Sequence, residues 1–321
     1  MNIVRKPVSR SRREHRILIG LVSGVMIVAA CGGGATDVAP ENTTAQAPAS
    51  TETTETTTTV APTTTTLVPP DPCNPMPTSS TELVIETDLT EEQIKYFVCG
   101  LHIAVNEVES APPLMRLALF NNKEKLYETM ATFLPNSSFQ GSLGDQLGHA
   151  GLFDRDVIFW DYARSVSWAE NPAAAFRVGV HEMFHAIQSW QAWDGLGEAN
   201  PAWIKEGAAE YFAHRMLEKY GFDKHLLVQV ALGEDWAAGF TAIGMLAWWE
   251  TYGPYPGTFP PINYPVLAAV AARLVDMSSE KALYEDYWQE RSPDERWQDT
   301  FERVFGISVL KFYEAIDAEF G

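Results

Sequence analysis

Basic residues are scarce in this sequence of 321 residues. Lysine and arginine together number 23, against 42 aspartates and glutamates, which gives a formal net charge of −19. Nucleic-acid binding depends on basic patches that neutralise phosphate groups. The charge balance therefore predicts no nucleic-acid partner, and otherwise it bears on solubility rather than on fold.

The apolar run near the N-terminus is too short to cross a membrane. It covers residues 17–30, which is 14 residues, whereas a spanning helix needs about 20. Six basic residues and one acidic residue precede it in residues 1–16, and small residues end it. A basic start, a short apolar run and small residues before a cleavage site are typical of a secretory signal peptide. We expect residues 1–30 to be such a peptide.

The apolar run ends in Val28-Ala29-Ala30-Cys31, which resembles a bacterial lipobox. In that motif the cysteine becomes the first residue of the mature protein and carries lipid. The resemblance implies a protein that is anchored by lipid on Cys31 at the extracytoplasmic face of the cell membrane. A short membrane anchor that happens to contain a cysteine is the alternative. Without residues 1–30 the chain keeps 17 basic and 41 acidic residues, a net charge of −24.

Cysteine is also scarce, with three residues in the chain. Once Cys31 is assigned to lipid, Cys73 and Cys99 remain as a pair, and an exported protein folds in an oxidising compartment. We expect a disulfide between them, which would tie the start of the folded domain to its first helix. Two free buried thiols are the alternative.

Residues 31–72 contain almost none of the large apolar side chains that a core needs. They contain 14 threonines between Ala35 and Pro72, together with many prolines. Such a segment cannot bury enough surface to offset the entropy lost on ordering, and its prolines favour an extended backbone. We expect the lipidated cysteine to be followed by a disordered Thr/Pro-rich tether, and a catalytic domain to occupy residues 73–321.

The domain divides by pattern into a mixed α/β part, residues 73–170, and a helical part, residues 171–321. Alternating or short apolar runs indicate strands, and apolar residues at a 3.6-residue period indicate helices. In the first part we expect strands at 82–86, 114–120 and 156–160 and helices at 90–109 and 123–133. In the second part we expect helices at 172–193, 201–220, 240–252, 265–276, 279–290 and 295–305, and a last one from 308. The fold class predicted is α+β, with a small mixed β-sheet packed on a mainly helical lobe.

Two histidines lie four residues apart in the segment His181-Glu182-Met183-Phe184-His185. Residues with this spacing share one face of a helix, so both imidazoles can bind one Zn²⁺. Glu182 lies beside them and can take a proton, as general base, from a water molecule that the metal activates. Composition alone would give about 0.01 such matches in a chain of this length, so chance is a poor explanation. Two satisfied core histidines are the alternative.

A catalytic zinc needs a third protein ligand and an open position. Glu206 follows His185 after 20 residues, a gap that suits a turn and a return by an antiparallel helix. Glu210 lies one turn further on the same face and can accept a hydrogen bond from the other ring nitrogen of a ligand imidazole. Gly207 would let the two helices approach closely. A solvated helix face is the alternative for both carboxylates.

The segments HEMFH and WIKEGAAEY, residues 181–185 and 203–211, resemble the gluzincin metallopeptidases. That clan includes the thermolysin-like and the M1-aminopeptidase-like enzymes, and the resemblance covers roughly residues 150–321. It implies one zinc per chain with His181, His185 and Glu206 as ligands, Glu182 as base and Glu210 beside the ligands.

The sequence thus predicts a hydrolase, a zinc-dependent metallopeptidase that acts on peptide or protein substrates outside the membrane. The alternative is a non-catalytic zinc-containing envelope lipoprotein that acts as a binding or assembly module. In the clan a downstream tyrosine or histidine stabilises the oxyanion, and the candidates are Tyr252, Tyr255, Tyr264 and His225. His102, His149 and His214 have no partner at a metal-binding spacing, and we interpret them as structural or surface residues.

Overall fold

The structure, a computed structural model of the whole chain, describes part of the sequence. The described residues are 71–133, 152–154, 157–161, 171–192, 200–222, 246, 250, 264–292 and 294–320. The expected signal peptide, Cys31 and nearly all of the expected tether lie outside them. So does the expected helix at 240–252, apart from two positions. Within the described ranges, no helix is long and apolar enough to cross a membrane.

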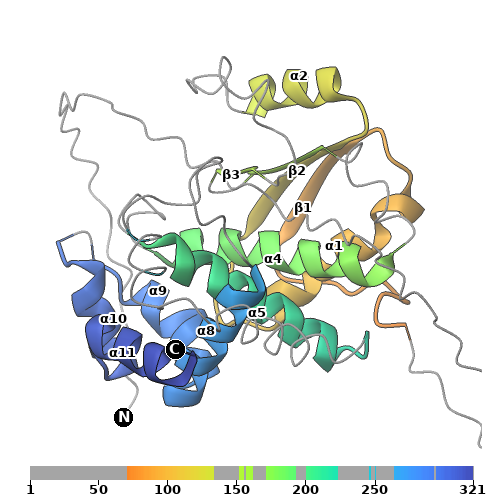
Figure 1. Cartoon of the computed structure of the whole chain (residues 1–321). Helices are drawn as coiled ribbons and strands as arrows, with labels where there is room; N and C mark the ends of the chain where they lie inside the picture. The colour runs from red at the N-terminus through yellow and green to blue at the C-terminus, as the bar shows by residue number, and fades with distance from the viewer. Residues whose placement is uncertain are drawn as a thin grey trace, which may run out of the picture.

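Four short strands form one sheet (Figure 1). They are β1 (Glu82–Thr87), β2 (Leu114–Phe120), β3 (Leu152–Asp154) and β4 (Val157–Asp161), in the spatial order β1-β2-β4-β3. β1, β2 and β4 run parallel, whereas β3 pairs antiparallel with β4. The three strands expected from the sequence match β1, β2 and β4 to within about one residue, well inside the usual uncertainty of element boundaries. β3 is missing from the expectation because three residues are too few to show an alternating pattern.

The first helix, α1 (Glu91–Asn106), begins where the sequence supplies a complete cap. Thr90 Oγ1 accepts a hydrogen bond from the Gln93 backbone N–H at 3.3 Å, and the Thr90 backbone N–H donates to Gln93 Oε1 at 2.8 Å. This reciprocal pair satisfies N–H groups that a helix start would leave without partners. A disulfide joins Cys99, within α1, to Cys73, with the two Cα atoms 5.6 Å apart. It ties the start of the described domain to its first helix, which is the pairing that the cysteine count predicts.

The described chain is mainly helical and also contains the four-stranded sheet, so its class is α+β. α2 (Lys123–Phe133) follows β2. After residue 171 come α4 (Pro172–Gln191), α5 (Ala202–Lys219), α8 (Tyr264–Met277), η4 (Ala282–Asp286), α9 (Tyr287–Gln289), α10 (Trp297–Phe305) and α11 (Val309–Phe320). The helix expected at 279–290 contains η4, a π-helix. Apolar spacing does not reveal such a local change in the hydrogen-bond ladder.

α4 lies at the centre of the described structure, packed against both α1 and α5 (Figure 1). Every residue from Val178 to Gln188 is buried. α1 and α4 cross at a pair of glycines. A Cβ on Gly100 would lie 2.4 Å from the Phe176 carbonyl oxygen, and one on Gly179 would lie 2.1 Å from the Phe97 carbonyl oxygen. Both distances are far inside van der Waals contact with rigid backbone, so only glycine permits this crossing.

Packing rather than a cap fixes the start of α5. Pro201, at its N-cap, supplies no side-chain hydrogen bond. Instead, the buried Trp203 stacks on Phe312 with ring centroids 5.8 Å apart, and it meets Phe301 edge-on at 6.1 Å. These large apolar contacts hold the first turn of α5 against α10 and α11.

Gly207 of α5 faces α8 rather than α4. A Cβ at Gly207 would lie 3.0 Å from the Leu267 carbonyl oxygen and 3.6 Å from the Ala271 Cβ. The expectation that Gly207 brings the two motif-bearing helices together is therefore wrong. The glycine relieves crowding on the opposite face of α5, where α8 covers it.

We expect alanine at Gly179 to lower the free energy of unfolding by about 3 kcal/mol, since overpacking a rigid core costs roughly 1–3 kcal/mol or more. Alanine at Gly207 should cost about 1 kcal/mol or less, because the clash is milder and alanine favours the helix. Urea unfolding of both variants beside the unchanged protein measures the two losses. Equal losses at the two positions would contradict this account of the α1–α4 crossing.

Candidate metal centre

The two motif histidines lie in the most deeply buried stretch of α4. The helix begins with Asn171, whose Oδ1 accepts the Ala174 N–H at 3.1 Å, and with Pro172 in its first turn. Both features favour a helix start. Further along, His181 and His185 are 1% and 2% exposed. Buried polar groups are costly unless they are bonded, so the surroundings must supply partners for both rings.

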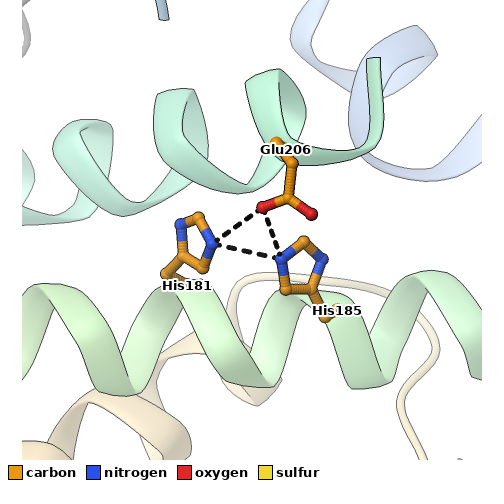
Figure 2. A group of neighbouring side chains, drawn as sticks. All are labelled: His181, His185 and Glu206. Carbon is orange, nitrogen blue, oxygen red and sulfur yellow. Dashed lines mark hydrogen bonds and ion pairs between the residues drawn. The ribbon is translucent and has the colours of Figure 1, made fainter. Parts of the chain in front are cut away.

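His181, His185 and Glu206 converge on one point (Figure 2). The two Nε2 atoms are 3.1 Å apart, and Glu206 Oε2 lies 3.5 Å from that of His181 and 3.2 Å from that of His185. A tetrahedral ion with ligand distances of about 2.0–2.1 Å holds its ligand atoms about 3.3 Å apart. The three observed separations lie close to that value. This buried group can therefore hold a metal ion.

The convergence arises because α5 runs antiparallel to α4, and Figure 2 shows the two helices side by side. Arg177, early in α4, contacts Glu210, whereas His185, two turns later, contacts Glu206. Along this contact the residue numbers rise in α4 and fall in α5, so the two helices run in opposite directions. The 20 residues between His185 and Glu206 allow the return that the sequence predicts.

The carboxylate of Glu206 is only partly satisfied by protein groups. Within the described chain its buried Oε1 accepts no hydrogen bond, and Lys205 Nζ lies 3.6 Å from it. Burial would raise the pKa of Glu206, but charge on His185 and hydrogen bonds from His181 and His185 hold that pKa well below its usual range. An ionised carboxylate that faces two imidazole nitrogens in a dry site is a donor set that suits a divalent cation.

Glu182 is buried beside His181 and His185. Burial raises the pKa of its carboxyl group, while charges on His181 and His185 oppose the rise and Glu206 adds to it. These interactions indicate that the carboxyl group feels the field of all three converging residues. Its place beside the two imidazoles puts this carboxyl group within the surroundings of the converging group, where a proton-transfer group would be needed.

Glu210 supports His181 from the next turn of α5. Its Oε2 accepts a hydrogen bond from His181 Nδ1 at 3.0 Å, Arg177 donates to Oε1 at 2.7 Å, and His214 Nε2 lies 2.8 Å from Oε1. Burial would raise the pKa of Glu210, but the charges of Arg177 and His214 and the hydrogen bonds from His181 and His214 hold it well below its usual range. A carboxylate that accepts from Nδ1 leaves the Nε2 lone pair of His181 aimed at the converging group.

Sequence reasoning missed three polar residues around the converging group. Gln188 contacts His185, and Arg177 and His214 contact Glu210. Helical spacing could have found all three, since Gln188 follows His185 by three residues. Arg177 precedes His181 by four residues and His214 follows Glu210 by four, so each pair shares a helix face. The interpretation of His214 as a structural or surface residue omits its buried bond to Glu210.

Of the residues considered for the oxyanion, Tyr264 lies within the described chain. It is the first residue of α8, and its ring centroid lies 6.1 Å from that of His181, with an interplanar angle of 70°. His102 bonds elsewhere, with Nδ1 2.8 Å from Ser79 Oγ. The remaining residues considered lie outside the described residues, namely Tyr252, Tyr255, His225 and His149.

Comparisons of the chain with models of known protein families, with curated proteins and with solved structures give no match. The case for a function therefore rests on the chemistry of the described residues and on the resemblance of the two sequence segments.

We expect zinc to raise the thermal unfolding midpoint of the protein, because an ion that binds only the folded state stabilises it. Glu206→Gln should abolish most of that rise. His102→Gln, which alters a half-buried histidine outside the converging group, should retain it. Differential scanning calorimetry with and without zinc measures both variants. An equal rise in Glu206→Gln would show that zinc binds elsewhere on the chain.

Proposed function

We propose that this protein is a zinc-dependent metallopeptidase of the gluzincin type. One observation carries the proposal. Two imidazole nitrogens and a carboxylate oxygen lie within 3.5 Å of one another in a buried contact, with the Glu182 carboxyl group beside them. Two nitrogen donors and one oxygen donor form a set that suits catalytic zinc.

When bound by His181, His185 and Glu206, zinc would polarise a substrate carbonyl and lower the pKa of a water molecule towards neutrality. The chain itself supplies the proton transfers. Glu182 takes a proton from the attacking water and passes it to the leaving amine nitrogen as the peptide bond breaks. Glu210 keeps the His181 ring oriented throughout, and Arg177 and His214 hold Glu210.

Tyr264 is the residue that we propose to stabilise the negative charge on the substrate oxygen. Support comes from its place at the start of α8, edge-on to the His181 ring. A phenolic O–H can donate to an oxygen atom that gains charge as the tetrahedral species forms, and such a donor is most effective where water is excluded.

The proposal includes a location at the extracytoplasmic face of the cell membrane. The short apolar run at 17–30 and the lipobox-like segment that ends at Cys31 support a lipid anchor. The disulfide between Cys73 and Cys99 supports an oxidising compartment. In that place the enzyme would act on peptide or protein substrates of the cell envelope and its surroundings.

Glu182→Gln should lower the rate of peptide hydrolysis by about 10²–10⁴-fold, which is the usual contribution of a general acid or base. It should leave zinc content unchanged, because Glu182 is not a ligand. Turnover of a fluorogenic peptide library and elemental analysis measure the two quantities. Glu128→Gln, on the exposed side of α2, is the matched control and should change neither.

Hydrolysis that survives Glu182→Gln would remove Glu182 from the role of base. A protein that holds zinc but cleaves no peptide, with either Glu or Gln at position 182, would favour the binding or assembly module instead.

Tyr264→Phe should lower kcat by about 10²–10³-fold with little change in KM or zinc content, because the lost donor acts on charge that develops in the transition state. Tyr211→Phe is the control, since the Tyr211 hydroxyl donates to Glu280 at 3.4 Å. Steady-state kinetics of both variants measure the changes in kcat and in KM separately. A change confined to KM in Tyr264→Phe would argue for a role in substrate binding instead.

A further inference from the structure

Gln188 is completely buried at the end of the all-buried stretch of α4, with 0% exposure. A polar amide in such a place is destabilising unless both of its ends are bonded. Its Oε1 lies 2.8 Å from His185 Nδ1, and its Nε2 donates to the Lys205 carbonyl oxygen at 3.0 Å. One side chain therefore contacts the second histidine of the metal centre and the peptide group just before Glu206.

The bond to Lys205 fixes which way the amide faces. A backbone carbonyl oxygen only accepts hydrogen bonds, so the amide nitrogen must point at it. The amide oxygen then faces His185, and an amide oxygen also only accepts. It follows that His185 Nδ1 carries the ring hydrogen and donates it to Gln188.

In the neutral ring, this tautomer leaves the lone pair of His185 on Nε2. That atom lies 3.1 Å from His181 Nε2 and 3.2 Å from Glu206 Oε2. In the other neutral tautomer an N–H would point at the same place, and Nε2 could not bind a metal. Glu210 constrains His181 in the same way, but with a charged acceptor.

We propose that Gln188 is a positioning residue of the metal centre. It holds His185 in the Nδ1–H tautomer and sets the ring so that Nε2 faces the metal position. The inference rests on the metal centre of the proposed function but not on hydrolysis. Partners of this kind typically alter metal affinity by about 10–100-fold.

Two substitutions distinguish the hydrogen bond to His185 from the hydrogen bond to the Lys205 carbonyl oxygen. Gln188→Leu removes both hydrogen bonds while keeping a similar volume. Gln188→Glu loses the bond to the Lys205 carbonyl but keeps an oxygen that His185 can donate to. Both variants lose the link between α4 and α5, and they differ in the acceptor offered to His185 and in the charge that Gln188→Glu adds.

Two readouts on the full-length protein are independent of activity. Competition with a chromophoric chelator gives zinc affinity, and heteronuclear NMR of the imidazole nitrogens in the metal-free protein gives the His185 tautomer. We expect Gln188→Leu to weaken zinc binding by about 10–100-fold and to give a mixture of tautomers. We expect Gln188→Glu to keep the Nδ1–H tautomer and a zinc affinity within about threefold of the unchanged protein.

Thr81→Val is the matched control. The buried Thr81 Oγ1 donates to the Pro112 carbonyl oxygen at 2.6 Å, and losing that bond should leave zinc affinity unchanged. Unchanged affinity and tautomer in Gln188→Leu would overturn the inference and leave the metal centre standing. If Gln188→Leu does not fold, a changed tautomer in Gln188→Glu overturns the inference by itself. A wild type that binds no zinc would sink the proposed function, and the NMR comparison of metal-free proteins would still decide the role of Gln188.

Discussion

Two imidazoles and a carboxylate meet in the contact between α4 and α5, where each of the three residues is at most 2% exposed. Hydrogen bonds at the far side of each ring leave both Nε2 lone pairs directed at Glu206 Oε2. When both Nε2 atoms are unprotonated, three acceptors within 3.5 Å of one another repel unless a cation lies among them, and low local polarity strengthens that repulsion. The α4–α5 contact can therefore hold an ion, and the neighbouring polar bonds keep the three atoms close together.

The rest of the described fold supplies the precision that such a contact requires. The glycine pair at the α1–α4 crossing brings the backbones of the two helices into contact, so α4 has little freedom to slide along α1. Trp203 anchors the first turn of α5 one helical turn before Glu206, in place of a cap. Different acceptors then orient the two rings, a charged carboxylate for His181 and a neutral amide for His185. Packing of the helices and hydrogen bonds to the side chains keep such groups within the small range of positions that metal binding requires.

Local patterns predicted most of the described elements and the convergence of His181, His185 and Glu206, because their signals lie within a few residues or a single loop. The spacing of His181 and His185 fixes a common helix face, and the distance along the chain to Glu206 permits an antiparallel return. The capping box at Thr90 marks the start of α1. The errors concern tertiary contacts. Which helix Gly207 faces depends on the rotation of α5 about its axis, and Gln188 looks in sequence like any polar residue near a helix end. Its role depends on the Lys205 carbonyl, which α5 brings from across the contact.

X-ray absorption at the zinc edge of the purified protein tests the central claim most directly, because it reports the atoms that surround the ion. The account predicts a shell of nitrogen and oxygen atoms at about 2.0–2.1 Å, with the outer-shell scattering of two imidazole rings and no sulfur. A shell that contains sulfur at about 2.3 Å, or one made of oxygen atoms without imidazole, would contradict it.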